Sequence, residues 1–325
     1  MSLVRKRVVW LVALAGILAA GRLVSLPYFA EGPGPTRDVE KLIKITGHTE
    51  YASDGRFLLT SVAQSAGRLS PLELVAVWLD PSESVIPEDQ VLAPGQTDQQ
   101  LDLRERSEMD QSKIDATVVV LSQIGDYPEE HGEGALVEAV EPGCPADGKL
   151  YPGDLIVSID DQRVLSRADA SRAIDAVPAD RPISLEVRAA GKTLQVDLAR
   201  KPCGPHEEPL LGVSLLDNFP FGVSMSSAGI GGPSAGLMWA LGLYDLLTPG
   251  DLTGGRTIAG TGEIGADGSV YPIGGVEKKL LGAEDAGAKI FLVPKDNLEE
   301  ARSAGAGVTL VAVGTFDEAV RKLSG

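Results

Sequence analysis

The chain has 325 residues, of which 43% are hydrophobic and 23% are charged, so it can form two or three folded domains and is not a disordered polymer. Its formal net charge of −17 at pH 7 argues against a nucleic acid as its partner, because phosphate backbones attract basic proteins. The chain has only two cysteines and three histidines, and their spacing does not match a zinc site.

The N-terminus carries a targeting pattern. Three basic residues at 5–7 precede an uncharged, mostly apolar stretch at 8–21, which as a helix is ~21 Å long against a bilayer core of ~30 Å. Arg22 interrupts this stretch, but residues 8–29 are long enough to span if its side chain reaches the interface. We expect a membrane anchor with 1–7 in the cytoplasm and the rest exported. A cleaved signal peptide is the alternative, and it exports the chain equally.

A further unit is predicted at 30–116. Residues 56–62 have the pattern of a strand, and 72–79 that of a short helix stopped by Asp80-Pro81. The charged, amphipathic run at 98–116 predicts a helix that packs on its neighbours. This unit shows no catalytic constellation.

The middle of the chain alternates strands with a single helix. A strand is expected at 135–140, a helix at 167–176, and a hairpin of strands at 183–188 and 193–198. The runs PGCPA at 142–146 and GDLIVSID at 153–160 resemble those of a bacterial PDZ domain. The resemblance implies a groove that binds an extended peptide as an added strand beside a helix. A spacer whose groove stays empty is the alternative.

The cysteines and histidines predict no catalytic centre. Cys144 falls in a loop of the middle domain and Cys203 just after its last strand, so an exported chain permits a disulfide, with two free thiols as the alternative. The histidines (His48, His131 and His206) are scattered through loops, and His206 is expected on the surface of a Pro/Glu-rich linker. A Ser-His-Asp site is therefore not expected.

The first candidate catalytic residue is Ser234. The run GGPSAG at 231–236 precedes three apolar residues spaced as on one helix face, namely Leu237, Leu241 and Tyr244. Because proline is favoured at the first helical position, Ser234 is expected in the first turn of a buried helix. The backbone at Gly232, Pro233 and Ala235 is then a candidate to support an oxyanion. The alternative is that Ser234 only caps the helix.

The second candidate is Lys279. With Gly274-Gly275 as the helix entry, three apolar residues share one face, namely Val276, Leu280 and Ala283. Lys279 borders this face, and Lys278 is expected to point to solvent. A lysine serves as a base near neutral pH only if burial lowers its pKa from ~10.4 to roughly 7–8. A lysine with its stem on the core and its amine in water is the alternative.

The motifs together resemble the proteolytic domain of the Lon protease family, over about 208–325. The resemblance rests on GPSAG at 232–236, TGEI at 261–264, PIGG at 272–275 and KIFLVPKDN at 289–297. It implies that Ser234 is the nucleophile, that Lys279 is the general base, and that Thr261 lies near this dyad with its hydroxyl orienting the amine.

Three features depart from that family's pattern. Gly231 stands where Lon proteases commonly carry an acidic residue, and residues 277–279 read EKK where KEK is usual. The separation of Ser234 and Lys279 is also about two residues longer, which we assign to the loop at 248–257. None of these departures removes the dyad.

The predicted fold class is a multidomain α+β and α/β chain. Its predicted parts are a cytoplasmic tip and transmembrane signal anchor at 1–29, an extracytoplasmic unit at 30–116, a PDZ domain at 117–202 and a Lon-type proteolytic domain at 203–325. This layout resembles the membrane-anchored PDZ–Lon proteins of Gram-positive bacteria.

The layout predicts an ATP-independent, membrane-anchored serine endopeptidase. No nucleotide-binding motif occurs in the sequence, and no cofactor, metal or nucleic acid is expected. The expected partners are unfolded or peptide-like protein substrates and the membrane, and the family resemblance implies a homo-oligomeric ring such as a hexamer. The alternative is a catalytically inactive PDZ scaffold that recruits peptides at the membrane.

Overall fold

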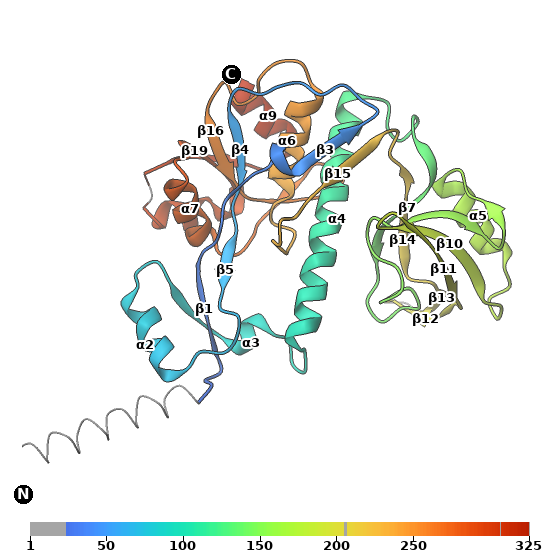
Figure 1. Ribbon diagram of the computed structural model, residues 1–325, viewed down its shortest axis with the longest axis horizontal. Helices are drawn as coiled ribbons and strands as arrows, with labels where there is room; N and C mark the ends of the chain where they lie inside the picture. Colours follow the sequence, from blue (N-terminus) through green and yellow to red (C-terminus); the bar gives the residue numbers. More distant parts are fainter. Residues whose placement is uncertain (1–23, 205–206, 306, 325) are drawn as a thin grey trace, which may run out of the picture.

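The computed structural model describes residues 24–204, 207–305 and 307–324 (Figure 1). Most of the predicted anchor, at 1–23, lies outside this range. Its last residues, 24–29, are not helical, because β1 (Tyr28–Pro33) begins within them as a strand. Within the described ranges we find no helix that is both long and apolar enough to cross a bilayer.

A five-stranded sheet forms the centre of an α/β body. Its order is β2-β4-β16-β19-β20, and its last four strands run parallel. The strands are β2 (Arg37–Asp38), β4 (Arg56–Leu59), β16 (Thr257–Gly260), β19 (Ile290–Pro294) and β20 (Thr309–Val313). Consecutive side chains of a strand point to opposite faces. Accordingly, Phe57 and Leu59 pack in one hydrophobic cluster, and Leu58 between them packs in another.

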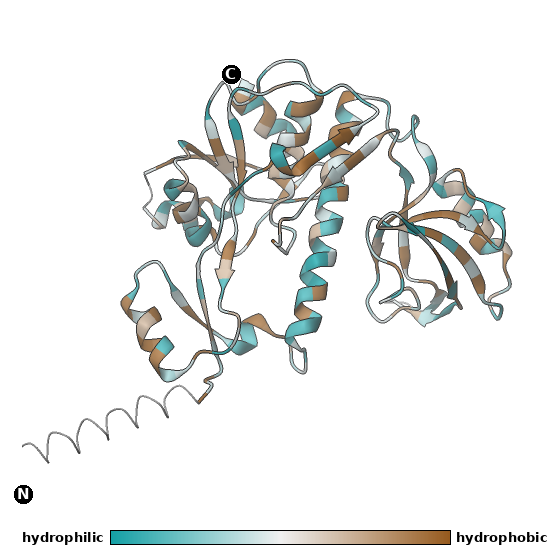
Figure 2. Ribbon diagram, viewed as in Figure 1, coloured by the Kyte–Doolittle hydropathy of each residue, from teal (hydrophilic) through white to brown (hydrophobic). Residues whose placement is uncertain are grey.

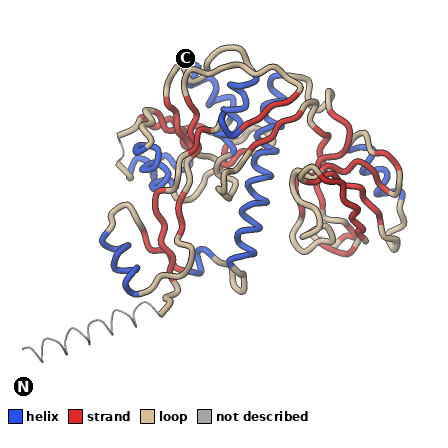
Figure 3. The backbone as a smooth tube through the Cα atoms, viewed as in Figure 1, coloured by secondary structure: helices blue, strands red, loops and turns tan. Residues whose placement is uncertain are grey.

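Helices cover both faces of this sheet (Figures 1 and 3). The first cluster joins the sheet to α4 (Asp98–Ile124), α6 (Gly236–Leu247) and α9 (Phe316–Ser324). The second joins it to α7 (Val276–Asp285) and α8 (Leu298–Ser303), the latter preceded by the 3₁₀ turn η2 (Lys295–Asn297). The body is therefore a three-layer arrangement, with α6 and α7 on opposite faces.

The segment predicted as a unit at 30–116 shares its structure with the C-terminal region. β4 pairs with β16, and β3 (Ile43–Thr46), which follows the turn η1 (Glu40–Leu42), pairs with β15 (Gly222–Met225). The predicted helix at 98–116 continues to Ile124 as α4 and packs against α6, where Trp239 Nε1 lies 3.4 Å from Met109 Sδ. The predicted boundary at 116 thus falls inside α4.

A small lobe is formed by two segments of the chain that lie before β2 and after β4. The predicted strand at 56–62 divides here, because β4 ends at Leu59 and β5 (Val62–Gln64) belongs to a separate sheet of order β5-β1-β6. The lobe is completed by β6 (Ser84–Pro87), α2 (Pro71–Leu79) and α3 (Glu88–Val91). Ser70 and Glu73 form a capping box that starts α2, close to the predicted start at 72.

The middle domain is a β-rich unit whose sheet has the order β11-β10-β8-β7-β14. Its elements are β7 (Gly132–Val140), β8 (Leu155–Ile159), β9 (Gln162–Arg163), α5 (Arg167–Ala176), β10 (Ile183–Ala189) and β11 (Lys192–Leu198). The predicted helix at 167–176 is confirmed residue for residue. The edge strand β14 (Val213–Asn218) comes from the region predicted as proteolytic, so the sheet extends past the predicted boundary at 202.

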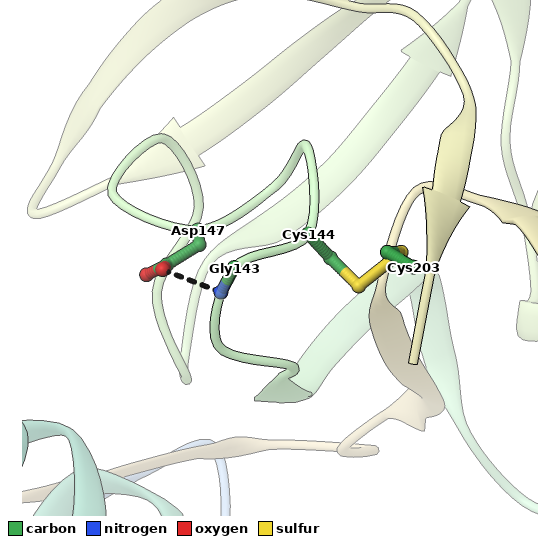
Figure 4. Close-up of a disulfide and its surroundings, with 4 residues drawn as sticks. All are labelled: Gly143, Cys144, Asp147 and Cys203. Atoms are coloured by element: carbon green, nitrogen blue, oxygen red, sulfur yellow. Dashed lines mark hydrogen bonds between the residues drawn. A yellow bond between two sulfur atoms is a disulfide. The ribbon is translucent and has the colours of Figure 1, made fainter. Parts of the chain in front are cut away.

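A disulfide links Cys144 to Cys203 beside this edge strand (Figure 4). Cys203 ends β12 (Lys201–Cys203), which pairs with β13 (Glu208–Leu210). A Cβ on Gly212 would lie 2.1 Å from Cys144 Cβ, and Gly212 has a φ of +76°, so only glycine fits there. Of the two alternatives that the sequence left open, the structure shows the disulfide.

We expect loss of this disulfide to destabilise the middle domain by about 4 kcal/mol, because it closes a loop of 59 residues in the unfolded chain. Amide hydrogen exchange in β8 and β10 of a Cys144→Ser/Cys203→Ser variant measures this loss. Exchange in β19 of the α/β body is the internal control and should not change. Unchanged protection in β8 and β10 would contradict the prediction.

Candidate active site

Ser234, Thr261 and Lys279 meet where the central strand β16 ends. Thr261 directly follows β16, Ser234 lies two residues before α6 on one face of the sheet, and Lys279 lies in the first turn of α7 on the other. Lys279 Nζ lies 2.7 Å from Ser234 Oγ and 3.2 Å from Thr261 Oγ1. Ser234 and Lys279 line a cleft of about 450 Å³. The three side chains that the sequence singled out are thus within hydrogen-bond distance of one another.

Ser234 lies in a turn before the helix, so its predicted place in the first helical turn is wrong. The helix begins at Gly236, after the N-cap residue Ala235. The carbonyl of Ser234 accepts hydrogen bonds from the Thr261 hydroxyl at 3.0 Å and from Gly262 N–H at 2.8 Å. These bonds replace the intrahelical bond that this carbonyl would otherwise accept, which fixes the serine outside the helix.

Thr261 connects the two members of the dyad. Its side chain is fully buried, and its hydroxyl donates its proton to the Ser234 carbonyl, so its lone pair is free to accept from the Lys279 amine. A neutral amine that donates to Thr261 retains a lone pair that can point at Ser234 Oγ. The geometry thus orients Lys279 as an acceptor for the serine proton.

Burial sets the protonation of Lys279. Its side chain is 4% exposed, and the predicted face of Val276, Leu280 and Ala283 is fully buried beside it. Desolvation by burial lowers the pKa of Lys279 to about 8, and the negative charges of Glu31 and Glu300 partly oppose this shift. This burial excludes the alternative in which the stem of Lys279 lies on the core and its amine lies in water.

Lys278 is also buried, at 4% exposure, so the prediction that it points to solvent is wrong. Helical periodicity places it off the apolar face of α7, but β1 of the N-terminal lobe packs on α7 and covers that side. Lys278 Nζ lies 3.5 Å from Glu277 Oε1. Burial alone therefore does not distinguish the two lysines; contact with Ser234 does.

The backbone groups predicted to support an oxyanion differ in availability. Gly232 N–H donates to the Glu105 carbonyl at 2.9 Å, and Pro233 has no N–H, while its carbonyl accepts from Ser112 Oγ at 2.8 Å. Within the described part of the chain, the N–H groups of Ser234 and Ala235 have no protein acceptor. These two donors, and not Gly232, are available to an oxyanion formed at Ser234.

Two carboxylates in the cleft have no signal in the sequence. Glu31 comes from β1 and Glu105 from α4, and both line the cleft with Ser234. Burial raises the pKa of each, and in Glu31 the positive charges of Lys278 and Lys279 partly offset it. Glu105 also bears on Gly231, which stands where Lon proteases commonly carry an acidic residue. A Cβ on that glycine would lie 3.0 Å from Glu105 Oε2. An acidic side chain from α4 thus lies where the family carries one in the motif.

The described histidines lie away from the dyad. His48 stacks on Phe221 at 4.6 Å between ring centroids, and His131 contacts the Gly132 carbonyl in a loop. Neither lines the cleft. His206 lies outside the described residues.

Comparison with known proteins adds the family context. Residues 223–318 match the model of the Lon protease (S16) C-terminal proteolytic domain, and 136–189 match that of a PDZ domain. The chain is 36% identical over 106 residues to Lon protease 2 of Bacillus subtilis, covering 33% of this chain and 18% of that protein. It is 39% identical over 98 residues to Lon protease of Clostridium beijerinckii, covering 29% and 12%.

Among solved structures, the PDZ domain of an SdrC-like protein from Listeria innocua is similar at 23% identity and a TM-score of 0.24, covering 26% of this chain and 93% of that one. The two family-model matches place both predicted domain types in the chain, and the proteolytic match supports a serine peptidase. The chain spans less than a fifth of the length of the two Lon proteases that it matches.

Proposed function

We propose that this protein is an ATP-independent, membrane-anchored serine endopeptidase that acts outside the cytoplasm with a Ser234/Lys279 dyad. The observation that carries the proposal is the 2.7 Å separation of Ser234 Oγ and Lys279 Nζ, with the lysine buried and its pKa lowered to about 8. A serine hydroxyl is a weak nucleophile until an adjacent base takes its proton. A buried, neutral lysine is such a base.

The reaction follows from this geometry. Ser234 Oγ attacks the scissile carbonyl while its proton passes to Lys279 Nζ, and the N–H groups of Ser234 and Ala235 stabilise the oxyanion. Lys279 then gives the proton to the leaving amine, which releases the first product and leaves an acyl-enzyme. Water attacks the ester with Lys279 again as the base, which restores the free serine.

Peptide recruitment is assigned to the middle domain. β14 is an edge strand, and a groove of about 520 Å³ lies between it and α5, lined by side chains that include Ile174, Val213 and Leu215. An edge strand beside a helix can accept an extended peptide as an added strand. β14 also leads through β15 to the loop before Ser234, so groove and cleft lie on one continuous segment.

The proposed substrates are unfolded segments, loops or tails, because the sequence has no nucleotide-binding motif to power unfolding. The membrane location rests on the apolar stretch at 8–21 and its basic flank. A ring-shaped homo-oligomer, such as a hexamer, is proposed on the family resemblance. A catalytically inactive scaffold is the second candidate, since peptide binding in the groove beside β14 would not need the dyad.

The test uses the full-length protein in detergent, with no nucleotide, on one substrate in two states. Reduced and carboxymethylated α-lactalbumin, which is unfolded, should be cleaved, whereas the disulfide-intact form should resist. Added ATP should not change the rate, and a Ser234→Ala variant should cleave neither form. A nucleotide requirement would contradict ATP independence, and comparable cleavage of the folded form would contradict the proposed restriction to unfolded substrates. If the Ser234→Ala variant were as active as the parent, the assignment of the dyad would be wrong. A parent protein that binds peptide but does not cleave it would favour the scaffold.

A further inference from the structure

The helix α2 (Pro71–Leu79) has apolar residues on both its buried side and its exposed side. Its sequence PLELVAVWL contains a single charged residue, Glu73. One side packs on the small core of the lobe through Val77 and Leu74. The other side is exposed, with Val75 at 52%, Trp78 at 80% and Leu79 at 69%. These three residues are spaced i, i+3 and i+4, so they form one apolar face.

Such a face requires a partner. Large exposed apolar side chains gathered on one face of a helix mark an interaction site. Figure 2 shows this helix as a mainly hydrophobic element at the outer end of the lobe. Within the described part of the chain, nothing covers Trp78.

The position of α2 indicates what that partner is. The described chain begins at residue 24, and Leu26 N–H donates to the Leu69 carbonyl at 2.8 Å, immediately before the α2 cap Ser70. The start of the described chain is thus tied to the start of α2, at the end of the molecule away from the middle domain (Figure 1). The preceding 23 residues include the uncharged stretch at 8–21.

We propose that the exposed face of α2, formed by Val75, Trp78 and Leu79, inserts into the interfacial region of the lipid bilayer. Tryptophan is enriched at this depth, because its ring is apolar and its N–H is polar. Helices with one apolar face bind there without spanning. The neighbouring Asp80 and Glu83 are exposed, so binding should weaken as the fraction of anionic lipid rises. The inference rests on the proposed membrane location but not on the proposed peptidase chemistry.

This contact would also fix the active site relative to the membrane. The lobe that carries α2 supplies Glu31, Val62 and Gln64 to the catalytic cleft. Docking of α2 would therefore hold one wall of the cleft close to the bilayer surface. The substrates that this geometry favours are membrane-proximal segments of exported proteins.

The experiment uses the three tryptophans of the full chain in phosphatidylcholine vesicles that contain dibrominated lipid, a short-range fluorescence quencher. Trp239 is fully buried in the body and serves as an unquenched reference. In a Trp10→Phe variant we expect the lipid to quench the emission of Trp78, and a Trp10→Phe/Trp78→Phe variant should lose that quenching. Val75→Ser/Leu79→Ser in the Trp10→Phe background should reduce it.

A Trp78→Phe variant that retains Trp10 separates the two proposals. Lipid quenching of Trp10 without quenching of Trp78 would support the membrane location and overturn the α2 contact. In that case, quenching of Trp78 by iodide would show that it stays in water, whereas protection from iodide would show that a second copy or residues 1–23 cover it. Absence of lipid quenching at both positions would overturn the membrane location as well.

Discussion

A Lys279→Met variant should lose about 10²- to 10⁴-fold in kcat/KM on an unfolded substrate, the range expected for removal of a general base. Methionine has nearly the same length as lysine and suits a buried position, but it cannot take the Ser234 proton. Lys279→Arg should be equally inactive, because a guanidinium keeps its proton at any working pH. Peptide release measured by a quenched fluorogenic substrate provides the rates.

Lys278→Met is the matched control. It removes the same charge from the next residue, at the same 4% exposure, but Lys278 does not contact Ser234. We expect its kcat/KM to stay within about threefold of the parent, in keeping with a group outside the reacting atoms. The melting temperature of Lys279→Met should not fall, since burial disfavours the lysine charge below pH 8. An active Lys279→Met beside an inactive Lys278→Met would reverse the assignment.

The sequence predicts the parts of the site that depend on local pattern. The glycines at 274–275 and the apolar spacing of Val276, Leu280 and Ala283 place the start and the buried face of α7 correctly. The family resemblance adds Thr261 and Ser234 to the predicted site. In the structure, the end of strand β16 and the turn before α6 position these two residues beside Lys279. These features are predictable because each is encoded within about ten residues.

The misassigned features depend on contacts between distant segments. Lys278 is buried by β1, some 250 residues earlier in the chain, and no periodicity within α7 reveals it. Glu105 reaches the cleft only because α4 packs against α6. The strand β14 lies in the segment predicted as proteolytic, which begins at 203, but it pairs with β7 in the sheet of the middle domain. The proteolytic match itself begins only at 223, after β14. A single sequence contains no record of such pairings, so they appear only in the fold.

The pH dependence of kcat/KM should follow the deprotonation of Lys279. Only the neutral amine accepts a proton, and the pKa of Lys279 is lowered to about 8, so activity should rise with pH, reach half its plateau near pH 8 and level off above about pH 9. At pH 6 we expect a rate about 100-fold below the plateau, because the neutral fraction falls tenfold per pH unit. Initial rates between pH 5.5 and 9.5 on an unfolded substrate measure the midpoint.

The same group links stability to pH in the same direction. Between pH 8 and the ordinary value of 10.5, the unfolded chain binds a lysine proton that the folded protein has released, so this lysine makes folding more favourable as pH rises. Below pH 8 both states hold the proton, so the cost of burying the charge is fully present and this lysine no longer makes stability depend on pH. Rates measured over this pH range therefore need a thermal melt at each pH, to show that the fall in rate at low pH is not caused by unfolding.

The charges around Lys279 allow the rising limb of the pH–rate profile to be assigned to this residue. Glu31 on β1 and Glu300 on α8 both favour its protonated form, so removing either negative charge should lower the lysine pKa and move the limb to lower pH. Glu300 lies outside the cleft lining, so Glu300→Gln should move the midpoint with little change in the plateau rate. His206→Ala should leave the profile unchanged. A limb near pH ~6.5 that disappears in His206→Ala would identify a histidine as the base, because that is the usual histidine pKa, and the Ser/Lys mechanism would then be wrong.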